Sequence, residues 1–236
     1  GGGSAHSFGS LDLASVDDGD DDTPPQYVPE LHAYATGTVD PDHISGGNSH
    51  VTVLWQDHIT FQDLQINDSL AYVVFVHQFE GKISGAPQTA RFSANVSRVE
   101  PGGNVISYAE SQDFQGPGTF NGSISLKMPS TVLAYQNSDG SPSSVTYTLQ
   151  LSASGGSVFD SHSQFIGDGT SNFADTAALD FIYFTDAAGN PIADTQPIIG
   201  DNGQYFTRAI PEPTSATLLL IAAAFLPRLR RAARYT

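Results

Sequence analysis

Residues 144–152 read Ser-Val-Thr-Tyr-Thr-Leu-Gln-Leu-Ser, and this stretch decides the fold class. Apolar residues at the odd-numbered positions alternate with Thr and Gln at the even-numbered positions. Successive side chains of a β-strand point to opposite faces, so the apolar residues would share one face. The stretch therefore predicts a strand with one wet face and one buried face, the latter carrying Val145, Tyr147, Leu149 and Leu151.

The same alternation recurs along the middle of the chain. Val51, Val53 and Trp55 would share a face within residues 49–61. Within residues 119–128, the side chains expected on one face are Phe120, Gly122, Ile124, Leu126 and Met128. The complete set of predicted strands is 31–39, 49–61, 70–79, 88–99, 104–114, 119–128, 144–152, 158–165, 178–184 and 204–208.

Turn residues separate these runs, for example Asp40-Pro41, Gly155-Gly156 and the segment 188–191. No helical period occurs before residue 214, so residues 30–209 are predicted to form one all-β domain. We expect an antiparallel β-sandwich of jelly-roll type. Residues 70–79 are almost continuously apolar, which predicts a central strand that is buried on both faces.

Residues 1–29 are rich in Gly, Ser, Asp and Pro and include an acidic run at 17–22. Like charges at this density resist burial, so we expect a flexible acidic lead-in. Carboxylate oxygens suit Ca²⁺, but the spacing lacks the regular Asp loop and distal Glu of a calcium-binding loop. A solvated acidic tail is the preferred interpretation.

The other end of the chain has a different composition. Pro211, Glu212 and Pro213 precede an apolar stretch at 216–226, which leads to a basic cluster. An apolar helix followed by cations stops in a bilayer with the cations on the cytoplasmic side. Residues 210–236 therefore predict a short transmembrane helix followed by the membrane-stop cluster Arg228, Arg230, Arg231 and Arg234, although residues 214–227 are shorter than the ~20 residues of a perpendicular span.

This order of parts resembles the PEP-CTERM sorting signal of exported bacterial proteins. The resemblance rests on the Pro-Glu-Pro triplet at residues 211–213, the short apolar segment and the Arg-rich end, and it covers only residues 210–236. It implies recognition by an exosortase at Pro211, Glu212 and Pro213, transient anchoring by 216–226, and transfer of the body to the cell surface or exopolysaccharide matrix. Export also implies a signal peptide, which we expect to have been removed or to lie upstream.

Charge and cysteine content exclude several classes of function. The net charge is −16 at pH 7, and the body without its four tail arginines is still more acidic. Such a surface repels nucleic acid and anionic lipid. The chain has no cysteine, which excludes disulfides and thiolate zinc sites. We therefore expect no nucleic-acid partner and a domain that is held together by its core.

Histidines are the candidate ligands for a transition-metal ion such as zinc or copper. His50 and His58 share strand parity with Asp57 between them, and His77 lies in a strand that could pair nearby. Positions 50 and 58 are ~26 Å apart on one strand, so a site would need His77 with only one of them and lacks a third ligand. Histidines on the polar face of a sheet are the preferred interpretation, and no metal is predicted here.

The search for catalytic motifs gives no enzyme class. No Gly-x-Ser-x-Gly occurs, and Lys82 and Lys127 do not follow a phosphate-binding loop. Glycoside hydrolysis would need two carboxyl groups across a cleft, and Glu80 or Glu110 could supply one. No signal selects either residue, so the chain is predicted not to be an enzyme.

Carbohydrate binding is the alternative to a purely structural role. Exposed aromatic rings can stack on sugars, and the candidates are Trp55, Tyr72, Tyr108, Tyr135, Tyr147, Tyr183 and Tyr205. Asp and Asn in turns could bind Ca²⁺, and the candidates are Asp186, Asn190 and Asp194, or Asp168 and Asp175. Most of these aromatic residues are expected in the core, and turn Asp usually caps its own backbone.

The sequence as a whole predicts an exported, non-catalytic protein of the cell surface or extracellular matrix. Its expected partners are an exosortase and the membrane through the tail, together with an exopolysaccharide. No cofactor is expected, apart from the option of Ca²⁺. The alternative is a Ca²⁺-assisted carbohydrate-binding sandwich, and a secreted hydrolase ranks third.

Overall fold

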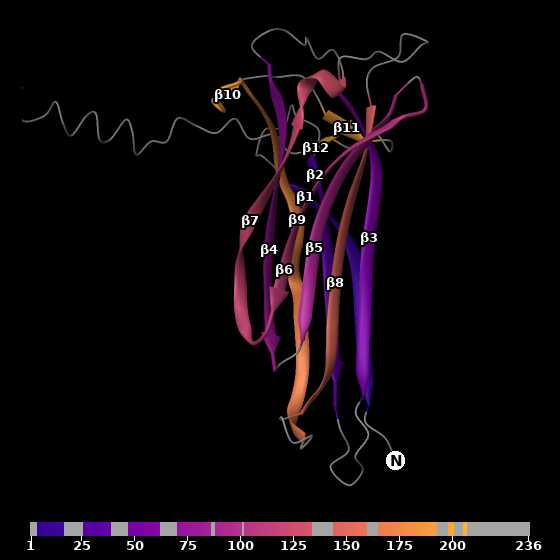
Figure 1. Ribbon diagram of the computed structural model, residues 1–236, viewed down its shortest axis with the longest axis vertical. Coiled ribbons are helices and arrows are strands. Elements are labelled where there is room, and N and C mark those ends of the chain that lie inside the picture. Colours follow the sequence, from indigo (N-terminus) through magenta and orange to yellow (C-terminus); the bar gives the residue numbers. More distant parts are fainter. Residues whose placement is uncertain are drawn as a thin grey trace, which may run out of the picture.

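The computed structural model describes residues 4–16, 26–38, 47–61, 70–85, 88–100, 102–133, 144–159, 165–192, 198–200 and 205–206. Long strands run along the long axis of the molecule (Figure 1). The first seven are β1 (Ala5–Val16), β2 (Gln26–Gly37), β3 (Asn48–Phe61), β4 (Tyr72–Ser84), β5 (Thr89–Val99), β6 (Val105–Gln115) and β7 (Gly118–Pro129). A short 3-10 helix, η1 (Ser130–Leu133), precedes β8 (Ser144–Phe159), β9 (Phe165–Thr185), β10 (Pro191–Ile192), β11 (Ile198–Gly200) and β12 (Tyr205–Phe206).

The strands form one continuous hydrogen-bonded sheet that folds into two layers. One layer has the order β3-β8-β5-β6, and the other has the order β2-β9-β4-β7 with β1 added beside β2. Successive strands cross repeatedly between the layers, as they do in jelly-roll double sheets. Within the described residues, all strand pairs are antiparallel except the two-residue pair of β12 with β2. The predicted all-β, antiparallel class is therefore confirmed.

Aromatic rings from the two layers contact each other in the core. Phe75 of β4 stacks on Tyr147 of β8 with ring centroids 5.2 Å apart, although these strands are not neighbours in the sheet. Phe79 of β4 contacts Phe114 of β6 at 4.8 Å, and Phe114 contacts Phe173 of β9 at 4.9 Å. Such contacts between inner faces define a β-sandwich.

The predicted inward face of β8 is confirmed, because Val145, Tyr147, Leu149 and Leu151 are buried. The prediction for β4 is also confirmed. This strand lies between β9 and β7, and residues 73–77 are buried without interruption. Burial on both faces explains why the sequence of β4 does not alternate there.

The first strand corrects the prediction of a flexible lead-in over residues 1–29. Ala5–Val16 forms β1 and pairs along its whole length with β2. Gly9 allows this strand to pack closely against β3, because a Cβ at position 9 would lie 2.5 Å from Val53 Cγ2. The large apolar residues of this strand, Phe8, Leu11 and Leu13, are exposed, so no buried apolar run marked it in the sequence. Backbone pairing with β2 supplies most of its contacts. The acidic run at 17–22 lies outside the described residues.

A second correction concerns Gly155-Gly156, which the sequence analysis took as a turn. Both glycines lie inside β8, which continues to Phe159. A Cβ at Gly155 would lie only 2.3 Å from the backbone nitrogen of Thr36, so the missing side chain lets β8 pass close to β2. The predicted strand 158–165 is likewise replaced by the end of β8 and the start of β9.

The two layers are joined where β8 pairs with the beginning of β9. This pairing runs from Gly156 opposite Gly169 to Phe159 opposite Phe165. At the other end of the molecule, Ser130 Oγ donates a hydrogen bond to the carbonyl oxygen of Leu70 at 2.6 Å, which fixes η1 beside β4. No helix within the described residues has the length and apolarity needed to cross a membrane. The predicted transmembrane helix at 216–226 lies outside the described residues.

Candidate ligand-binding face

The outer surface of the β3-β8-β5-β6 layer is made mostly of polar side chains, together with the exposed Leu54, and we call it the polar face. Alternation creates it, because the residues between the buried apolar positions of each strand point outward. On β5, for example, Ala90, Phe92 and Ala94 point into the core, whereas Arg91 and Ser93 point outward. The polar face consists of His50, Thr52, Leu54, Gln56 and His58 of β3, Thr146, Thr148, Gln150, Ser152 and Ser154 of β8, Thr89, Arg91, Ser93, Asn95 and Ser97 of β5, and Ser107, Ala109, Ser111, Asp113 and Gln115 of β6.

Strand register aligns these side chains in rows across the layer. Thr52 lies opposite Ser152, Ser152 lies opposite Arg91, and Arg91 lies opposite Asp113. Neighbouring strands are ~4.8 Å apart, and same-face residues repeat every ~6.8 Å along a strand. The result is a regular grid of hydroxyl and amide groups.

Hydrogen bonds between neighbouring strands hold several groups of the polar face in place. Asn95 Nδ2 donates to Ser107 Oγ at 2.7 Å, and the backbone N–H of Thr89 donates to Ser154 Oγ at 3.0 Å. Within β3, His50 Nε2 also lies 3.1 Å from Thr52 Oγ1. The Asn95 amide keeps further donor and acceptor capacity, whereas Ser154 Oγ also contacts the Thr89 hydroxyl at 3.0 Å and donates to the Thr89 carbonyl oxygen at 2.9 Å. The face is therefore partly ordered before any ligand arrives.

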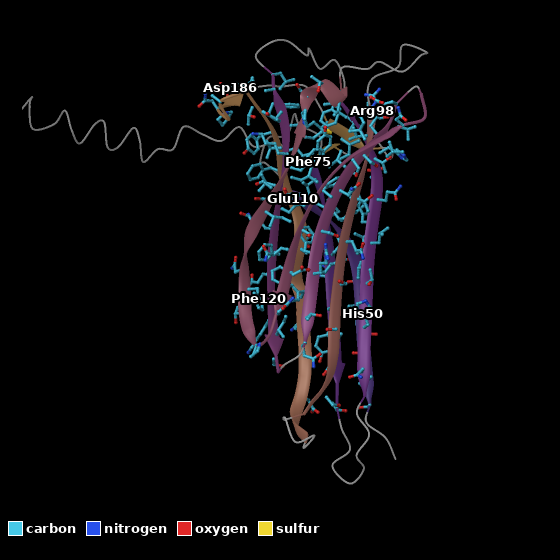
Figure 2. All side chains as sticks on the ribbon, in the orientation of Figure 1. His50, Phe75, Arg98, Glu110, Phe120 and Asp186 are labelled. Carbon is cyan, nitrogen blue, oxygen red and sulfur yellow. The ribbon has the colours of Figure 1, made fainter. Side chains whose placement is uncertain are left out.

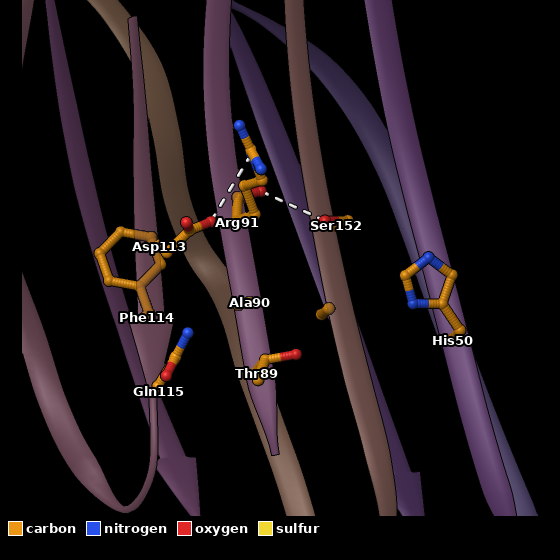
Figure 3. Close-up of a pocket in the computed structure, with 9 residues that line it drawn as sticks. His50, Thr89, Ala90, Arg91, Asp113, Phe114, Gln115 and Ser152 are labelled. Atoms are coloured by element: carbon orange, nitrogen blue, oxygen red, sulfur yellow. Dashed lines mark hydrogen bonds and ion pairs between the residues drawn. The ribbon is translucent and has the colours of Figure 1, made fainter. Parts of the chain in front are cut away.

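A shallow pocket of about 290 Å³ opens at one end of the polar face (Figure 3). Its polar lining includes His50, Thr89, Arg91, Asp113 and Ser152. The Arg91 Nε atom lies 3.6 Å from Asp113 Oδ1, and both side chains are more than half exposed. The pair makes this part of the face locally neutral while leaving polar atoms accessible to a ligand.

The polar face has little charge for such an acidic protein. Apart from His50 and His58, its only acidic or basic side chains are Arg91 and Asp113, which lie 3.6 Å apart and compensate each other. The protein as a whole has a net charge of −16. The composition of the face therefore favours a neutral, hydrogen-bonding ligand, because ionic ligands find little charge there to neutralise.

The histidines that the sequence analysis compared do not converge on one point. His50 and His58 lie on the polar face, with His50 toward the end of β3 that is opposite the Asp186 turn (Figure 2). His77 instead lies on the inner face of β4 and is fully buried. Asp57 is also buried, and its Oδ1 accepts the backbone N–H of His58 at 2.8 Å. Within the described part of the chain, no three His or acidic side chains gather to hold a metal ion.

His77 takes part in a buried polar contact between the two layers. Its Nε2 atom lies 2.5 Å from the hydroxyl oxygen of Tyr147, and its ring stacks on that residue with centroids 6.0 Å apart. Burial lowers the pKa of His77 to about 4, partly offset by the backbone of Ile124. Burial also raises the pKa of Tyr147. Both groups are therefore neutral at pH 7, and the contact is part of the core.

The aromatic residues considered for sugar stacking lie in different parts of the structure. Trp55 and Tyr147 are buried and meet edge to face at 5.6 Å. Tyr108 is half-buried and packs against the core. Tyr72 and Tyr183 lie on the outer face of the β2-β9-β4-β7 layer, opposite the polar face. Tyr135 and the side chain of Tyr205 lie outside the described residues.

The carboxylate of Asp186 stabilises the turn that follows β9. Asp186 accepts hydrogen bonds from the backbone N–H and the side-chain amide of Asn190, both at 2.8 Å. These bonds, first of all the one from the Asn190 side chain, lower the pKa of Asp186. The other proposed calcium residues do not support a turn site, because Asp168 and Asp175 lie within β9. Asp194 lies outside the described residues.

Glu80 and Glu110 are not arranged as a pair. Glu80 is exposed on β4 opposite Asn121 on the outer side of its layer. Glu110 is on β6 opposite Ala94, whose side chain points into the sandwich. The two carboxyl groups therefore lie on different layers and on different sides of them.

The predicted sorting residues, from Pro211 through Arg234, lie outside the described residues. The alternation of residues 144–152 predicts the wet face of β8, whereas no motif in the sequence singles out Arg91, Asp113 or Gln115. Their only signal in the sequence was the outward alternation of β5 and β6.

Comparison with known proteins does not assign this chain to a family. No protein-family model matches the chain, and no curated protein matches it significantly. One similar solved structure concerns the promiscuous specificity of carbohydrate-binding modules from the β-sandwich superfamily, with a TM-score of 0.25 and 10% sequence identity. The match covers 75% of this chain and 57% of that chain, so this chain spans little more than half of the compared protein.

Proposed function

We propose that this protein is an exported, non-catalytic β-sandwich that binds a neutral polysaccharide of the cell surface or extracellular matrix through its polar face. One observation carries the proposal. On a protein with a net charge of −16, the outer surface of the β3-β8-β5-β6 layer presents mostly hydroxyl and amide side chains, with the Arg91–Asp113 ion pair among them.

The chemistry of the polar face matches that of sugar hydroxyl groups. Ser, Thr, Asn and Gln side chains both donate and accept hydrogen bonds, as a sugar hydroxyl does. Each such bond adds about 1 kcal/mol or less, so a useful affinity requires many of them at once. An extended polymer can contact several rows of the face together, which a monosaccharide cannot. The expected ligand is therefore a polymer.

The pocket at the end of the polar face supplies a more enclosed contact. Its volume of about 290 Å³ is at the lower end of ligand pockets, which favours a single sugar ring over a larger molecule. Asp113 would accept hydrogen bonds from hydroxyl groups, and Arg91 would donate to ring or hydroxyl oxygens. The rest of the polymer would continue over the face.

Electrostatics support a neutral polymer. The acidic protein repels polyanions, which also argues against nucleic acid as a partner. Because the face itself has little net charge, binding should change little with ionic strength. Salt dependence therefore distinguishes this interaction from binding of a charged polymer.

The carbohydrate proposal is tested with the full chain by affinity gel electrophoresis in neutral polysaccharides such as β-glucan, mannan and dextran. We expect at least one of them to retard the protein. The polar-face variant Asn95→Ala/Gln150→Ala removes two outward amides and should weaken retardation about 5-fold or more. Asn121→Ala, an exposed amide on β7, is the control. An unretarded wild-type protein, or equal retardation of all variants, would overturn the proposal.

Export is proposed from the sequence of the tail. Pro211, Glu212 and Pro213 would be recognised by an exosortase, while residues 216–226 and the following arginines would hold the chain in the membrane. Cell fractionation and mass measurement of the mature protein test this proposal. Substitution of Pro211, Glu212 and Pro213 by Ala should leave uncleaved protein in the membrane fraction. Full-length wild-type protein in the cytosol would contradict export.

A further inference from the structure

A second cluster of accessible aromatic side chains lies on the layer opposite the polar face. On β4, Val74 pairs with Tyr183 of β9, and Val76 pairs with Phe181. Paired residues lie side by side on one face of a sheet. The inward neighbours Phe75 and Ile182 are buried in the core, which places this cluster on the outer surface.

The rings of Phe181 and Tyr183 lie next to each other, beside two buried valines of β4. The centroids of Phe181 and Tyr183 are 5.8 Å apart, and both side chains are half-buried. Val74 and Val76 beside them are buried, so the strip has a tightly packed apolar base. We call Phe181 and Tyr183, with these two valines, the aromatic strip.

Polar groups border the aromatic strip at both ends. At one end, Gln78 Nε2 donates a hydrogen bond to Asp180 Oδ2 at 2.7 Å, and this contact is exposed. At the other end, Lys127 Nζ lies 3.8 Å from the centre of the Tyr72 ring. The Gln78 carbonyl oxygen and the second Asp180 oxygen keep the capacity to accept hydrogen bonds from a ligand.

The size of the aromatic strip argues against a protein partner. Stable protein interfaces bury ~800 Å² on each side, whereas one aromatic side chain supplies at most ~150–250 Å². Two half-buried rings therefore fall well short of a protein interface. Their width suits a small ligand that has one apolar surface and a polar edge.

We infer that Phe181, Tyr183, Gln78 and Asp180 form a second saccharide-binding site. A sugar ring has an apolar C–H face that can lie on one of the two aromatic rings, whose planes are tilted by 43° to each other. Its edge of hydroxyl groups can reach the Asp180 carboxylate and the Gln78 amide. An apolar platform with a few directed polar groups is the usual construction of a small-molecule site.

The second site extends the proposed function. One consequence of it, cross-linking of polymer chains, also requires the proposed binding at the polar face. The polar face and the aromatic strip lie on opposite outer surfaces of the sandwich. If both bind polysaccharide, one protein molecule joins two polymer chains, and the linkage is strengthened by multivalency. The protein would then cross-link the matrix.

The test compares two variants of the full chain with wild-type protein. Gln78→Ala/Asp180→Ala removes the exposed polar edge and should preserve the fold. Phe181→Ala/Tyr183→Ala removes the rings, and circular dichroism establishes whether it folds. Phe8→Ser is the matched control, because Phe8 is an aromatic residue on β1 with 59% exposure and lies away from the strip.

The first measurement uses soluble oligosaccharides of the polysaccharide that retards wild-type protein in affinity gel electrophoresis. NMR line broadening gives the affinity of each variant for these oligosaccharides. We expect the strip variants to bind about 3- to 10-fold more weakly, while Phe8→Ser matches wild type. Equal affinity of wild type and the Gln78→Ala/Asp180→Ala variant would overturn the second site, whether or not the ring variant folds.

The second measurement is polymer cross-linking, followed by light scattering of the polysaccharide as protein is added. Wild-type protein should increase scattering, whereas the strip variants and the Asn95→Ala/Gln150→Ala variant should not. Loss of scattering only in the Asn95→Ala/Gln150→Ala variant would reject the aromatic strip and retain the proposed function. Loss only in the strip variants would retain the strip and reject the polar face.

Discussion

The Nε2 atom of His77 lies 2.5 Å from the hydroxyl oxygen of Tyr147, and the two residues belong to opposite layers of the sandwich. Both side chains are fully buried. This contact is a polar link inside an otherwise apolar part of the core, so it couples stability to pH and to the presence of both groups.

Stability should fall in moderately acidic solution because of His77. The pKa of this residue is about 4 in the folded protein, against 6.5 as its ordinary value. Between these two pH values, the unfolded chain binds a proton that the folded protein does not. Above pH 6.5, His77 protonation does not lower the free energy of unfolding of the protein. As the pH falls from 6.5 to about 4, this free energy should decrease by about 3 kcal/mol.

Urea denaturation at pH values from 4 to 8 measures this dependence. The variant His77→Leu cannot take up the proton, so its stability should decrease much less over the same range. The comparison uses the pH slope, because the absolute stability of the variant will also change. Parallel slopes in the two proteins would exclude His77 as the source.

Removal of the Tyr147 hydroxyl should destabilise the protein at neutral pH. The variant Tyr147→Phe leaves His77 Nε2 buried without its partner, which costs about 1–3 kcal/mol. Tyr108→Phe, on the half-buried inner side of β6, is the matched control and should have a smaller effect. Chemical denaturation at pH 7.5 gives both values. Tyr147→Phe with wild-type stability would show that the hydrogen bond contributes little.

Gly155 should be intolerant of any side chain. A Cβ there would lie 2.3 Å from the backbone nitrogen of Thr36, and a backbone cannot move aside as a flexible side chain can. We expect Gly155→Ala to destabilise the protein by about 2 kcal/mol or more. Gly102→Ala, whose Cβ would meet only Asn104 Nδ2 at 4.0 Å, should change stability by less than about 0.5 kcal/mol. Similar melting temperatures for both variants would contradict the close approach of β8 to β2.

The Asp186 turn should depend on its own hydrogen bonds and not on calcium. Asn190 donates to both carboxylate oxygens, so Asp186→Ala should lower the melting temperature, and Glu80→Ala should leave it nearly unchanged. Wild-type protein should melt at the same temperature in millimolar CaCl₂ and in EDTA. A higher melting temperature with Ca²⁺ that disappears in Asp186→Ala would indicate a calcium site at this turn.

Strand alternation was the most informative property of the sequence. The inward positions of residues 144–152 follow directly from period-two hydrophobicity, and the continuous apolar run of 73–76 correctly indicated a central strand. These predictions succeeded because burial of one or both faces determines the residue type at each position. They required no knowledge of strand order.

The features that the sequence did not predict depend on contacts between distant segments. The large apolar residues of β1, namely Phe8, Leu11 and Leu13, are exposed and do not form a buried run, so its pairing with β2 reveals that it is a strand. Gly155 and Gly156 resemble a turn until β8 is seen to pass next to the backbone of β2. The aromatic strip likewise arises from the pairing of β4 with β9, which no local pattern of residues 178–184 specifies.

The main-chain pairing of β8 with β9 has a consequence for how the domain opens. Because residues 156–159 bond to 165–169, the two layers cannot separate as independent plates. Pulling them apart would break backbone hydrogen bonds in the same long strands that supply Tyr147 and Phe173 to the interior. Loss of one layer therefore entails loss of the other, and the sandwich should melt in a single cooperative transition.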